Sequence, residues 1–181
     1  MSPRGQHRSG LVLDTHDLVR RAGEMREVRT TVTAPSDLGI AVIGVPEGAP
    51  IELDLRLEAV VEGVLVTGTA YAPLTGECVR CLTAVSDEIE VDVQELFTYA
   101  ESDAEDEEAS RLEGERADLE PVLRDAIVLE LPFQPVCRPD CAGLCPVCGH
   151  DLNADPDHSH DAAVDPRWAQ LAQFESEDEK S

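Results

Sequence analysis

Hydrophobic and polar residues alternate strictly along residues 51–59, where Ile, Leu or Ala takes every odd position and a charged residue every even one. A period of two is typical of a β-strand that buries one face and exposes the other to water. A second β-rich run covers residues 64–72, and Ile89, Val91 and Val93 alternate with acidic residues in a third. Because short turns separate the three runs, we expect an antiparallel β meander or a partly closed barrel.

Weaker patterns extend this sheet in both directions. Residues 11–14 and 28–34 predict two further strands. Residues 118–131 have the apolar spacing of a helix, in which Asp118 is a suitable N-cap and Pro132 stops the last turn. The apolar stripe of this helix is expected to pack on the sheet. The predicted fold class is therefore α+β, with one or two packed helices and a C-terminal cysteine knuckle.

The order of these segments predicts one main domain with flexible additions. Residues 1–10 form a polar leader expected to be disordered, and residues 11–153 form the β-rich domain. An acidic run without apolar periodicity interrupts the domain at 101–118 and is expected to be a loop. Residues 154–181 are an acidic tail, in which residues 165–174 are compatible with one short helix.

The chain is strongly acidic, with 38 Asp and Glu against 14 Lys and Arg and a net charge of -24. A polyanion repels such a chain, and direct nucleic-acid binding normally needs a basic footprint. Four arginines form the one local basic cluster, and acidic residues interrupt it: Arg20, Arg21, Arg26 and Arg29. Basic proteins are therefore the expected electrostatic partners.

No targeting or membrane segment is apparent, because the first ten residues are polar and no stretch approaches the ~20 apolar residues of a membrane span. We therefore expect a cytoplasmic protein without membrane contacts. Cysteines stay reduced in that compartment, so paired cysteine motifs indicate metal or redox chemistry before disulfides.

All six cysteines fall into two clusters, and a CxxC turn is well suited to present two thiolates to one tetrahedral zinc ion. Two ligand sets are open. The set favoured by its two CxxC motifs ties the meander to the C-terminal segment, and it consists of Cys78, Cys81, Cys145 and Cys148. The competing set is local and leaves the first pair free; it consists of Cys137, Cys141, Cys145 and Cys148. His150 is a reserve ligand.

Catalysis has little support in the sequence. A thioredoxin-like pair belongs at a strand-to-helix junction, whereas Cys78 and Cys81 lie between two β-rich runs. His158 and His160 offer imidazoles, but they lie in a polar, Asp-rich stretch without a predicted scaffold. A P-loop, a GxGxxG motif and a Ser-His-Asp arrangement are all missing from the sequence. We therefore expect no enzyme, no catalytic residue and no small-molecule substrate.

Several motifs resemble those of the YceD family, the large ribosomal RNA subunit accumulation proteins. They occur in the family's order between about residues 10 and 174: the CVRC motif with Leu82, the LELPF segment 129–133, the cysteine-rich segment 137–149, the DLN segment 151–153 and the DPRW segment 165–168. The resemblance implies a non-enzymatic role in large-subunit biogenesis, namely accumulation of 23S rRNA. It also implies a small, basic large-subunit ribosomal protein as partner.

Two other functions stay open at this point. One is a zinc module that binds rRNA directly, for which Arg20 and Arg21 are the candidate contacts. The other is a thiol-redox or metal-dependent enzyme, in which Arg80 lowers the pKa of a neighbouring thiol in the CVRC motif. The acidic charge disfavours the first, and the missing catalytic motifs disfavour the second.

Overall fold

The structure is a computed structural model, and it describes residues 10–18, 22–99 and 110–160. The chain divides into two compact units, Met1–Cys141 and Ala142–Ser181. This division lies after Cys141, whereas the sequence analysis places the end of the main domain at residue 153. The leader up to residue 9, the acidic run 100–109 and the helix expected at 165–174 lie outside the described residues.

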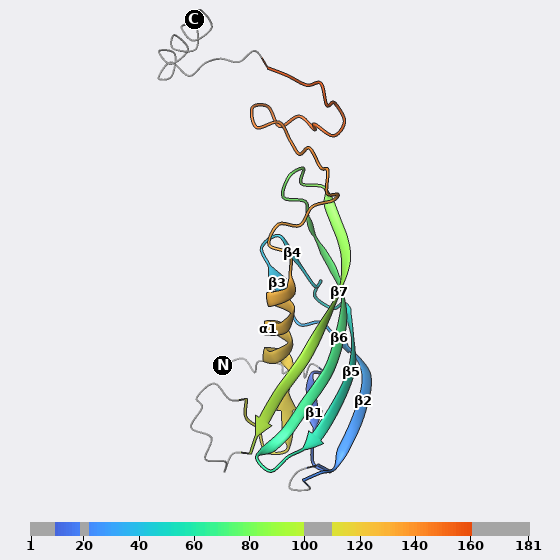
Figure 1. The fold of residues 1–181 in the computed structure, drawn as a ribbon, viewed down its shortest axis with the longest axis vertical. Helices are drawn as coiled ribbons and strands as arrows, with labels where there is room; N and C mark the ends of the chain where they lie inside the picture. The colour runs from blue at the N-terminus through green and yellow to red at the C-terminus, as the bar shows by residue number, and fades with distance from the viewer. Residues whose placement is uncertain (1–9, 19–21, 100–109, 161–181) are drawn as a thin grey trace, which may run out of the picture. The chain divides into compact units, whose positions relative to one another are not determined.

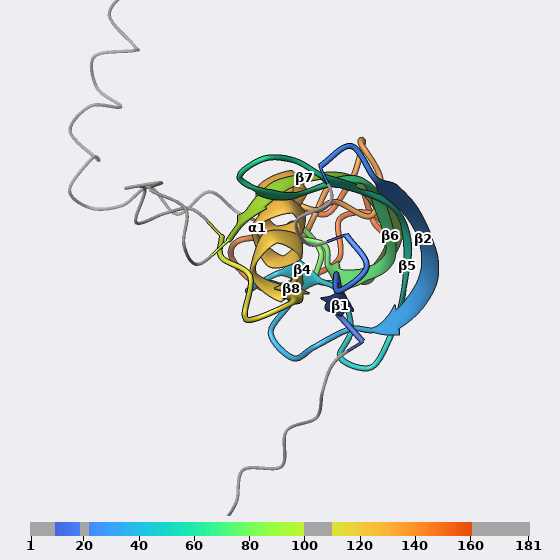
Figure 2. The same ribbon diagram turned by 90° about the horizontal axis from the view of Figure 1, so that it is seen from below.

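The first unit is built on an antiparallel sheet of six strands, which are β2 (Met25–Thr33), β3 (Gly39–Ile40), β4 (Ile43–Gly44), β5 (Pro50–Ala59), β6 (Gly63–Glu77) and β7 (Ala84–Thr98). β5, β6 and β7 follow one another as the predicted meander, with β2 beside β5. Figure 2 shows these four strands along an arc, with the helix α1 (Glu120–Glu130) on its concave side. Within the described residues the sheet curves without closing into a barrel, and its antiparallel order agrees with the predicted meander.

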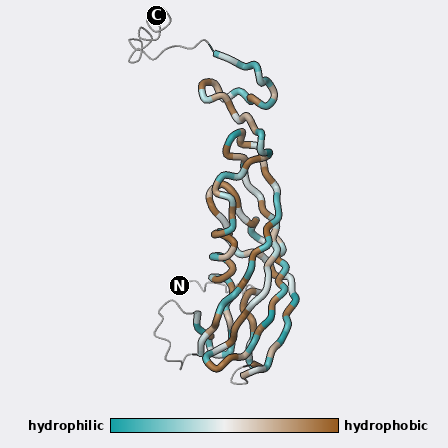
Figure 3. Tube along the Cα trace, viewed as in Figure 1, coloured by the Kyte–Doolittle hydropathy of each residue, from teal (hydrophilic) through white to brown (hydrophobic). Residues whose placement is uncertain are grey.

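Residues 51–59 form a strand with one buried and one exposed face, as their alternation predicts. Ile51, Leu53, Leu55 and Leu57 are at most 3% exposed, while the charged residues between them face outward. Figure 3 shows the same change of hydropathy from residue to residue along the strands. The apolar face joins one core that is filled mainly by aliphatic side chains, in keeping with the 3% of aromatic residues in the sequence.

The predicted helix is confirmed as α1, and it covers the apolar face of the sheet. Leu123 and Ile127 are its buried residues. Leu119 occupies the N-cap position without a side-chain cap, and Asp118 instead accepts a hydrogen bond from the Glu120 N–H at 3.0 Å. Leu131 takes an extended conformation before Pro132, as the residue before a proline usually does. The described residues include no helix with the length and apolar character needed to cross a bilayer.

Two short pairings in the structure escaped the sequence analysis. β1 (Val12–Asp14) pairs with β8 (Arg116–Asp118), so the last three residues of the predicted acidic loop are a strand. Ala117 of β8 is fully buried. β3 and β4 form a small hairpin whose second strand pairs with the end of β6. The strand predicted at residues 11–14 is confirmed as β1, but β3, β4 and β8 were missed, because strands of two or three residues are too short to show a clear periodicity.

Gly68 in the middle of β6 permits the close pairing of β6 with β5. Its φ is +148°, and a Cβ added there would lie 2.1 Å from the carbonyl oxygen of Asp54. We expect Gly68→Ala to lower the free energy of unfolding by about 1–3 kcal/mol, because the new methyl group forces the two backbones apart.

Urea denaturation followed by circular dichroism measures this loss. Thr67→Ala on the same strand is the control and should change the free energy of unfolding by less than about 0.5 kcal/mol. Equal midpoints for the two variants would contradict the importance of this close contact.

Candidate metal centre

The connection between β6 and β7 is a tight turn that presents two thiols at the tip of the hairpin. The Cys78 N–H donates to the Thr83 carbonyl at 2.8 Å, and the Leu82 N–H donates to the Cys78 carbonyl at 2.8 Å. Leu82 has a φ of +61°, a conformation that side chains other than Gly, Asn and Asp rarely adopt. Glycine would suit this position better, so the turn tolerates some strain to hold Cys78 and Cys81 together.

The segment that follows α1 returns to this tip, as Figure 1 shows. The Val79 N–H donates to the Pro135 carbonyl at 2.9 Å, and the Arg80 guanidinium donates to the Cys141 carbonyl at 2.9 Å. These bonds place Cys137 and Cys141 beside the CVRC turn. Arg80 therefore binds the backbone of the returning segment, a contact that a shorter side chain could not make.

The four thiols of this unit lie at the spacing of a tetrahedral zinc site. Cys78 Sγ is 3.8 Å from Cys141 Sγ, and Cys81 Sγ is 3.6 Å from Cys137 Sγ. Four sulfurs at about 2.3 Å from one zinc ion are about 3.8 Å apart from each other. All four ligand atoms lie within 4.8 Å of one another, and the cysteines are not disulfide-bonded. The cluster is therefore compatible with one zinc ion.

Hydrogen bonds favour a thiolate at two of these sulfurs. Burial alone would raise the pKa of Cys78, but backbone N–H groups of Cys137, Cys81 and Arg80 outweigh it and lower this pKa to about 6. The Thr83 side chain and N–H likewise lower the pKa of Cys81.

Cys137 behaves in the opposite way, because its hydrogen bond with the Cys81 sulfur raises its pKa to about 12. Without a metal, the cluster therefore keeps a proton that a bound cation would displace. Cys78 and Cys141 are buried, whereas Cys137 is exposed, so the site has one side open to water.

The structure distributes the six predicted thiols differently from both ligand sets of the sequence analysis. Cys78 and Cys81 come together with Cys137 and Cys141, whereas Cys145 and Cys148 belong to a second group with His158 and His160. The predicted sets joined the pair Cys145–Cys148 to one or the other pair of the first group. The ligand set stays a prediction, and this geometry favours the division into two groups.

Two features of the sequence are consistent with this division into two groups. The Cys137–Cys141 spacing is less regular than CxxC, but it still brings two thiols to one side of a turn. His158 and His160 form an HxH motif that begins ten positions after Cys148. Cys₂His₂ is a common structural zinc set, and the six cysteines together with the HxH motif are eight candidate ligands, enough for two ions.

The outward face of the sheet is the second notable surface of this unit. Strand register and burial place seven carboxylates and two guanidinium groups on it: Glu27, Glu52, Asp54, Glu58, Glu88, Glu90 and Asp92, with Arg29 and Arg56. We call this set the acidic face. Both arginines are already bound by carboxylates of the face, Arg29 by Asp54 at 3.0 Å and Arg56 by Glu58 at 2.9 Å.

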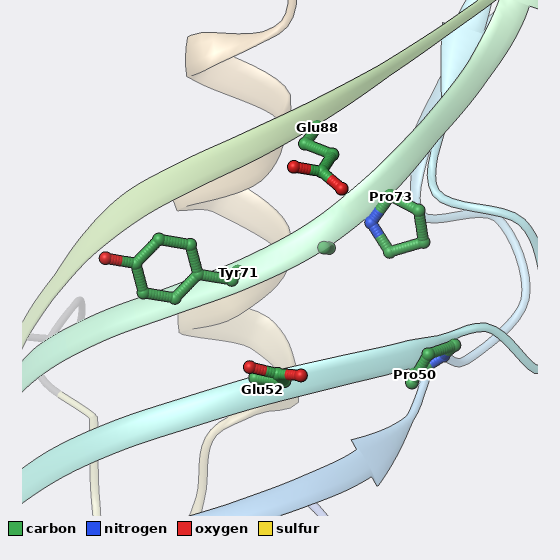
Figure 4. Close-up of a pocket in the computed structure, with 6 residues that line it drawn as sticks. Pro50, Glu52, Tyr71, Pro73 and Glu88 are labelled. Carbon is green, nitrogen blue, oxygen red and sulfur yellow. The ribbon is translucent and has the colours of Figure 1, made fainter.

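An open groove of about 390 Å³ crosses the acidic face, and Figure 4 shows the side chains that line it. Tyr71 is 45% exposed in the groove and lies opposite Glu52 on β5 and Glu90 on β7, while Glu88 lies opposite Pro73. The Tyr71 hydroxyl donates to Glu90 at 2.6 Å, and this bond raises the pKa of Tyr71. The tyrosine is therefore a protonated, oriented aromatic ring surrounded by negative charge.

The two arginines of the predicted basic cluster that the structure describes, Arg26 and Arg29, are both in ion pairs. Arg26 binds Asp17 at 2.8 Å, and Arg29 binds Asp54 on the acidic face. Arg20 and Arg21 lie outside the described residues. The described arginines of the cluster thus serve ion pairs within the protein.

Comparison with known proteins agrees with the motifs. The family model described as large ribosomal RNA subunit accumulation protein YceD matches residues 66–175. An uncharacterized protein of Mycobacterium tuberculosis (strain ATCC 25618 / H37Rv) is 48% identical over 92% of this chain and 82% of its own length. One of Mycobacterium leprae is 43% identical over 90% of this chain and 76% of its own length.

A further relative has lower identity. The uncharacterized protein YlbN of Bacillus subtilis is 28% identical over 71% of this chain and 73% of its own length. No solved structure matches the chain. The family's description concerns accumulation of an RNA and names no chemical reaction. With its CVRC turn, returning cysteine segment and matched residues 66–175, this chain belongs to the YceD family.

Proposed function

We propose that this protein is a non-enzymatic factor in the biogenesis of the large ribosomal subunit, and that it acts by binding a basic ribosomal protein. Membership of the YceD family is the observation that carries the assembly role. The acidic face and the net charge of -24 support a basic protein as the partner.

A structural zinc ion at Cys78, Cys81, Cys137 and Cys141 is part of this proposal. Cys81 and Cys137 are 56 positions apart in the sequence, so a shared ion closes a long loop and removes much conformational freedom from the unfolded chain. Four protein ligands leave no coordination position for a substrate, which supports a structural role over a catalytic one. The ion would hold the returning segment on the tip of the β6–β7 hairpin.

The acidic face has the features of a docking surface for Lys- and Arg-rich segments. Its two arginines are neutralised within the protein, so Glu52, Glu88 and Asp92 keep charge for a partner. Tyr71 offers an aromatic face to an incoming guanidinium or ammonium group. A protein that covers the basic surface of a ribosomal protein keeps that surface from premature contact with RNA. The same charge disfavours direct rRNA binding by the acidic face.

The zinc ligands are tested by metal content. We expect Cys78→Ser and Cys137→Ser each to bind one equivalent of zinc fewer than the wild-type chain, because each removes one thiolate from the same ion. Elemental analysis of dialysed protein measures the content, and the double variant should lose no more than either single variant. Full zinc retention by Cys137→Ser would instead support Cys78, Cys81, Cys145 and Cys148 as the ligands.

The partner surface is tested by removing its charge. The triple variant Glu52→Gln, Glu88→Gln, Asp92→Asn should bind basic large-subunit ribosomal proteins about tenfold more weakly at ~0.15 M salt. Three exposed ion pairs of about 0.5 kcal/mol each correspond to that factor. Calorimetry measures the affinity, and its dependence on salt should decrease in the variant.

A matched control changes the same net charge elsewhere on this unit. Glu47→Gln, Glu113→Gln, Asp125→Asn alters three exposed residues outside the acidic face and should leave the affinity within about twofold of wild type. If both triple variants weakened the affinity equally, the loss would reflect the net charge of the protein and would contradict a specific role of the acidic face. Tight binding of naked rRNA fragments together with indifference to basic ribosomal proteins would overturn the partner proposal.

The assembly role is tested in cells. Deletion of the gene should lower the ratio of large-subunit to small-subunit rRNA, as measured by quantitative RNA analysis and gradient sedimentation. The wild-type chain should restore the ratio, and the acidic-face triple variant should restore it less completely than the control variant. An unchanged ratio in the deletion strain would refute a role in large-subunit accumulation.

A further inference from the structure

The second unit contains a turn with the same hydrogen bonds as the CVRC turn. The Cys145 N–H donates to the His150 carbonyl at 2.7 Å, and the Gly149 N–H donates to the Cys145 carbonyl at 2.8 Å. The CVRC turn has the same two bonds. The N–H of its first cysteine donates to the carbonyl of the residue five positions later, and the carbonyl of that cysteine accepts from the N–H of the residue four positions later. Gly149 has a φ of +74°, so glycine stands where Leu82 is strained.

This turn also directs backbone N–H groups at its first sulfur. The Val147 and Cys148 N–H groups bond the Cys145 sulfur, as the Arg80 and Cys81 N–H groups bond that of Cys78. Donors at these positions stabilise a thiolate and leave the outer side of the sulfur free for a cation. The local backbone therefore forms a metal-binding knuckle before any ion is considered.

Two histidines complete the set of ligands around this knuckle. The Cys148 Sγ is 3.2 Å from His158 Nε2 and 3.3 Å from His160 Nε2, and the two Nε2 atoms are 3.0 Å apart. Bond lengths of about 2.3 Å to sulfur and about 2.0 Å to nitrogen give tetrahedral edges of about 3.5 Å and about 3.3 Å. Cys145 Sγ is the fourth ligand atom, and all four lie within 4.8 Å of one another. They converge on one point from two places in the chain.

Residues 142–160 have little apolar burial to hold this arrangement. Within that range Gly143 and Cys145 are the buried residues, while Val147 is 73% exposed. Polar contacts connect its ends: the Asn153 side chain accepts the Ala142 N–H at 2.8 Å, and the Leu152 N–H donates to the Gly143 carbonyl at 3.0 Å. A segment of this size without a core needs a staple, and metal binding supplies folding free energy directly.

We propose that Cys145, Cys148, His158 and His160 bind a second structural zinc ion, coordinated independently of the four-cysteine centre. An S₂N₂ set with tetrahedral spacing is typical of zinc. A two-iron cluster with two cysteines and two histidines puts the cysteines on one iron and the histidines on the other. The Cys148 sulfur is too close to both imidazole nitrogens for that arrangement. The proposal does not depend on the ribosomal role.

His150 is the competing ligand, and it serves as the control. Its ring stacks on His158 with 4.5 Å between centroids, and its Nε2 is 3.6 Å from an Asp155 carboxylate oxygen. These contacts orient the neighbouring ring, whereas the Nε2 atoms of His158 and His160 face the thiols. We expect His150→Asn to keep the wild-type zinc content.

The experiment counts zinc in full-length variants. The wild-type chain should hold two equivalents, and His158→Asn with His160→Asn should hold one. Cobalt substitution should then show four-thiolate absorption alone in the histidine variant, because the remaining site is the four-cysteine centre. Cys78→Ser with Cys137→Ser should give the converse, one ion in an S₂N₂ environment, so the two sites can fail independently.

A second measurement on the wild-type chain avoids variants that do not fold. Zinc should protect Cys145 and Cys148 from alkylation, and His158 and His160 from diethyl pyrocarbonate, as mapped by mass spectrometry. Equal modification of these four residues with and without zinc would overturn the proposal. So would a histidine variant that still holds two ions, or loss of one ion in His150→Asn alone.

Discussion

The pairing of β6 with β7 is the interaction on which the rest of the first unit depends. The two strands pair in one unbroken antiparallel register from Gly63 opposite Thr98 to Glu77 opposite Ala84. This register places the CVRC turn at the end of a long hairpin, beyond the part that α1 covers. It also aligns the acidic residues of β7 with Tyr71 and Glu52 across the sheet. One hairpin thus positions both the candidate metal centre and the candidate partner surface.

The two faces of the sheet are chemically opposite because each strand alternates in the same phase. The inner face is aliphatic and meets α1, while the outer face carries seven carboxylates with two arginines that are already paired. Repulsion among these carboxylates costs free energy in the isolated protein. A basic partner would relieve this repulsion, and binding at the acidic face would then be sensitive to salt.

The two cysteine knuckles have the same backbone hydrogen bonds. Each holds two thiols through a turn closed by two backbone hydrogen bonds, and other N–H groups of the same turn stabilise the thiolate of the first cysteine. Their candidate ligand sets differ because the other two ligands of each set come from different segments of the chain. The first knuckle receives two cysteines from the segment after α1, and the second receives two histidines from the loop that follows it. In a small protein with few aromatic residues, metal binding at these two groups would add stability that a small core does not supply.

Local sequence alone determined the strands of the meander, the helix and the two knuckles. Period-two alternation at residues 51–59, the stripe ending at Pro132 and the CxxC spacing each express local physics that a single segment satisfies by itself. The sequence did not determine which knuckle meets which partner ligands. That depends on where the chain after α1 returns and on how far the β6–β7 hairpin extends, and both follow from packing. The group of Cys148 with His158 and His160 is local in sequence, whereas the grouping of Cys78 with Cys141 was decided by tertiary structure alone, because residues distant in sequence become neighbours only when the backbone between them has folded.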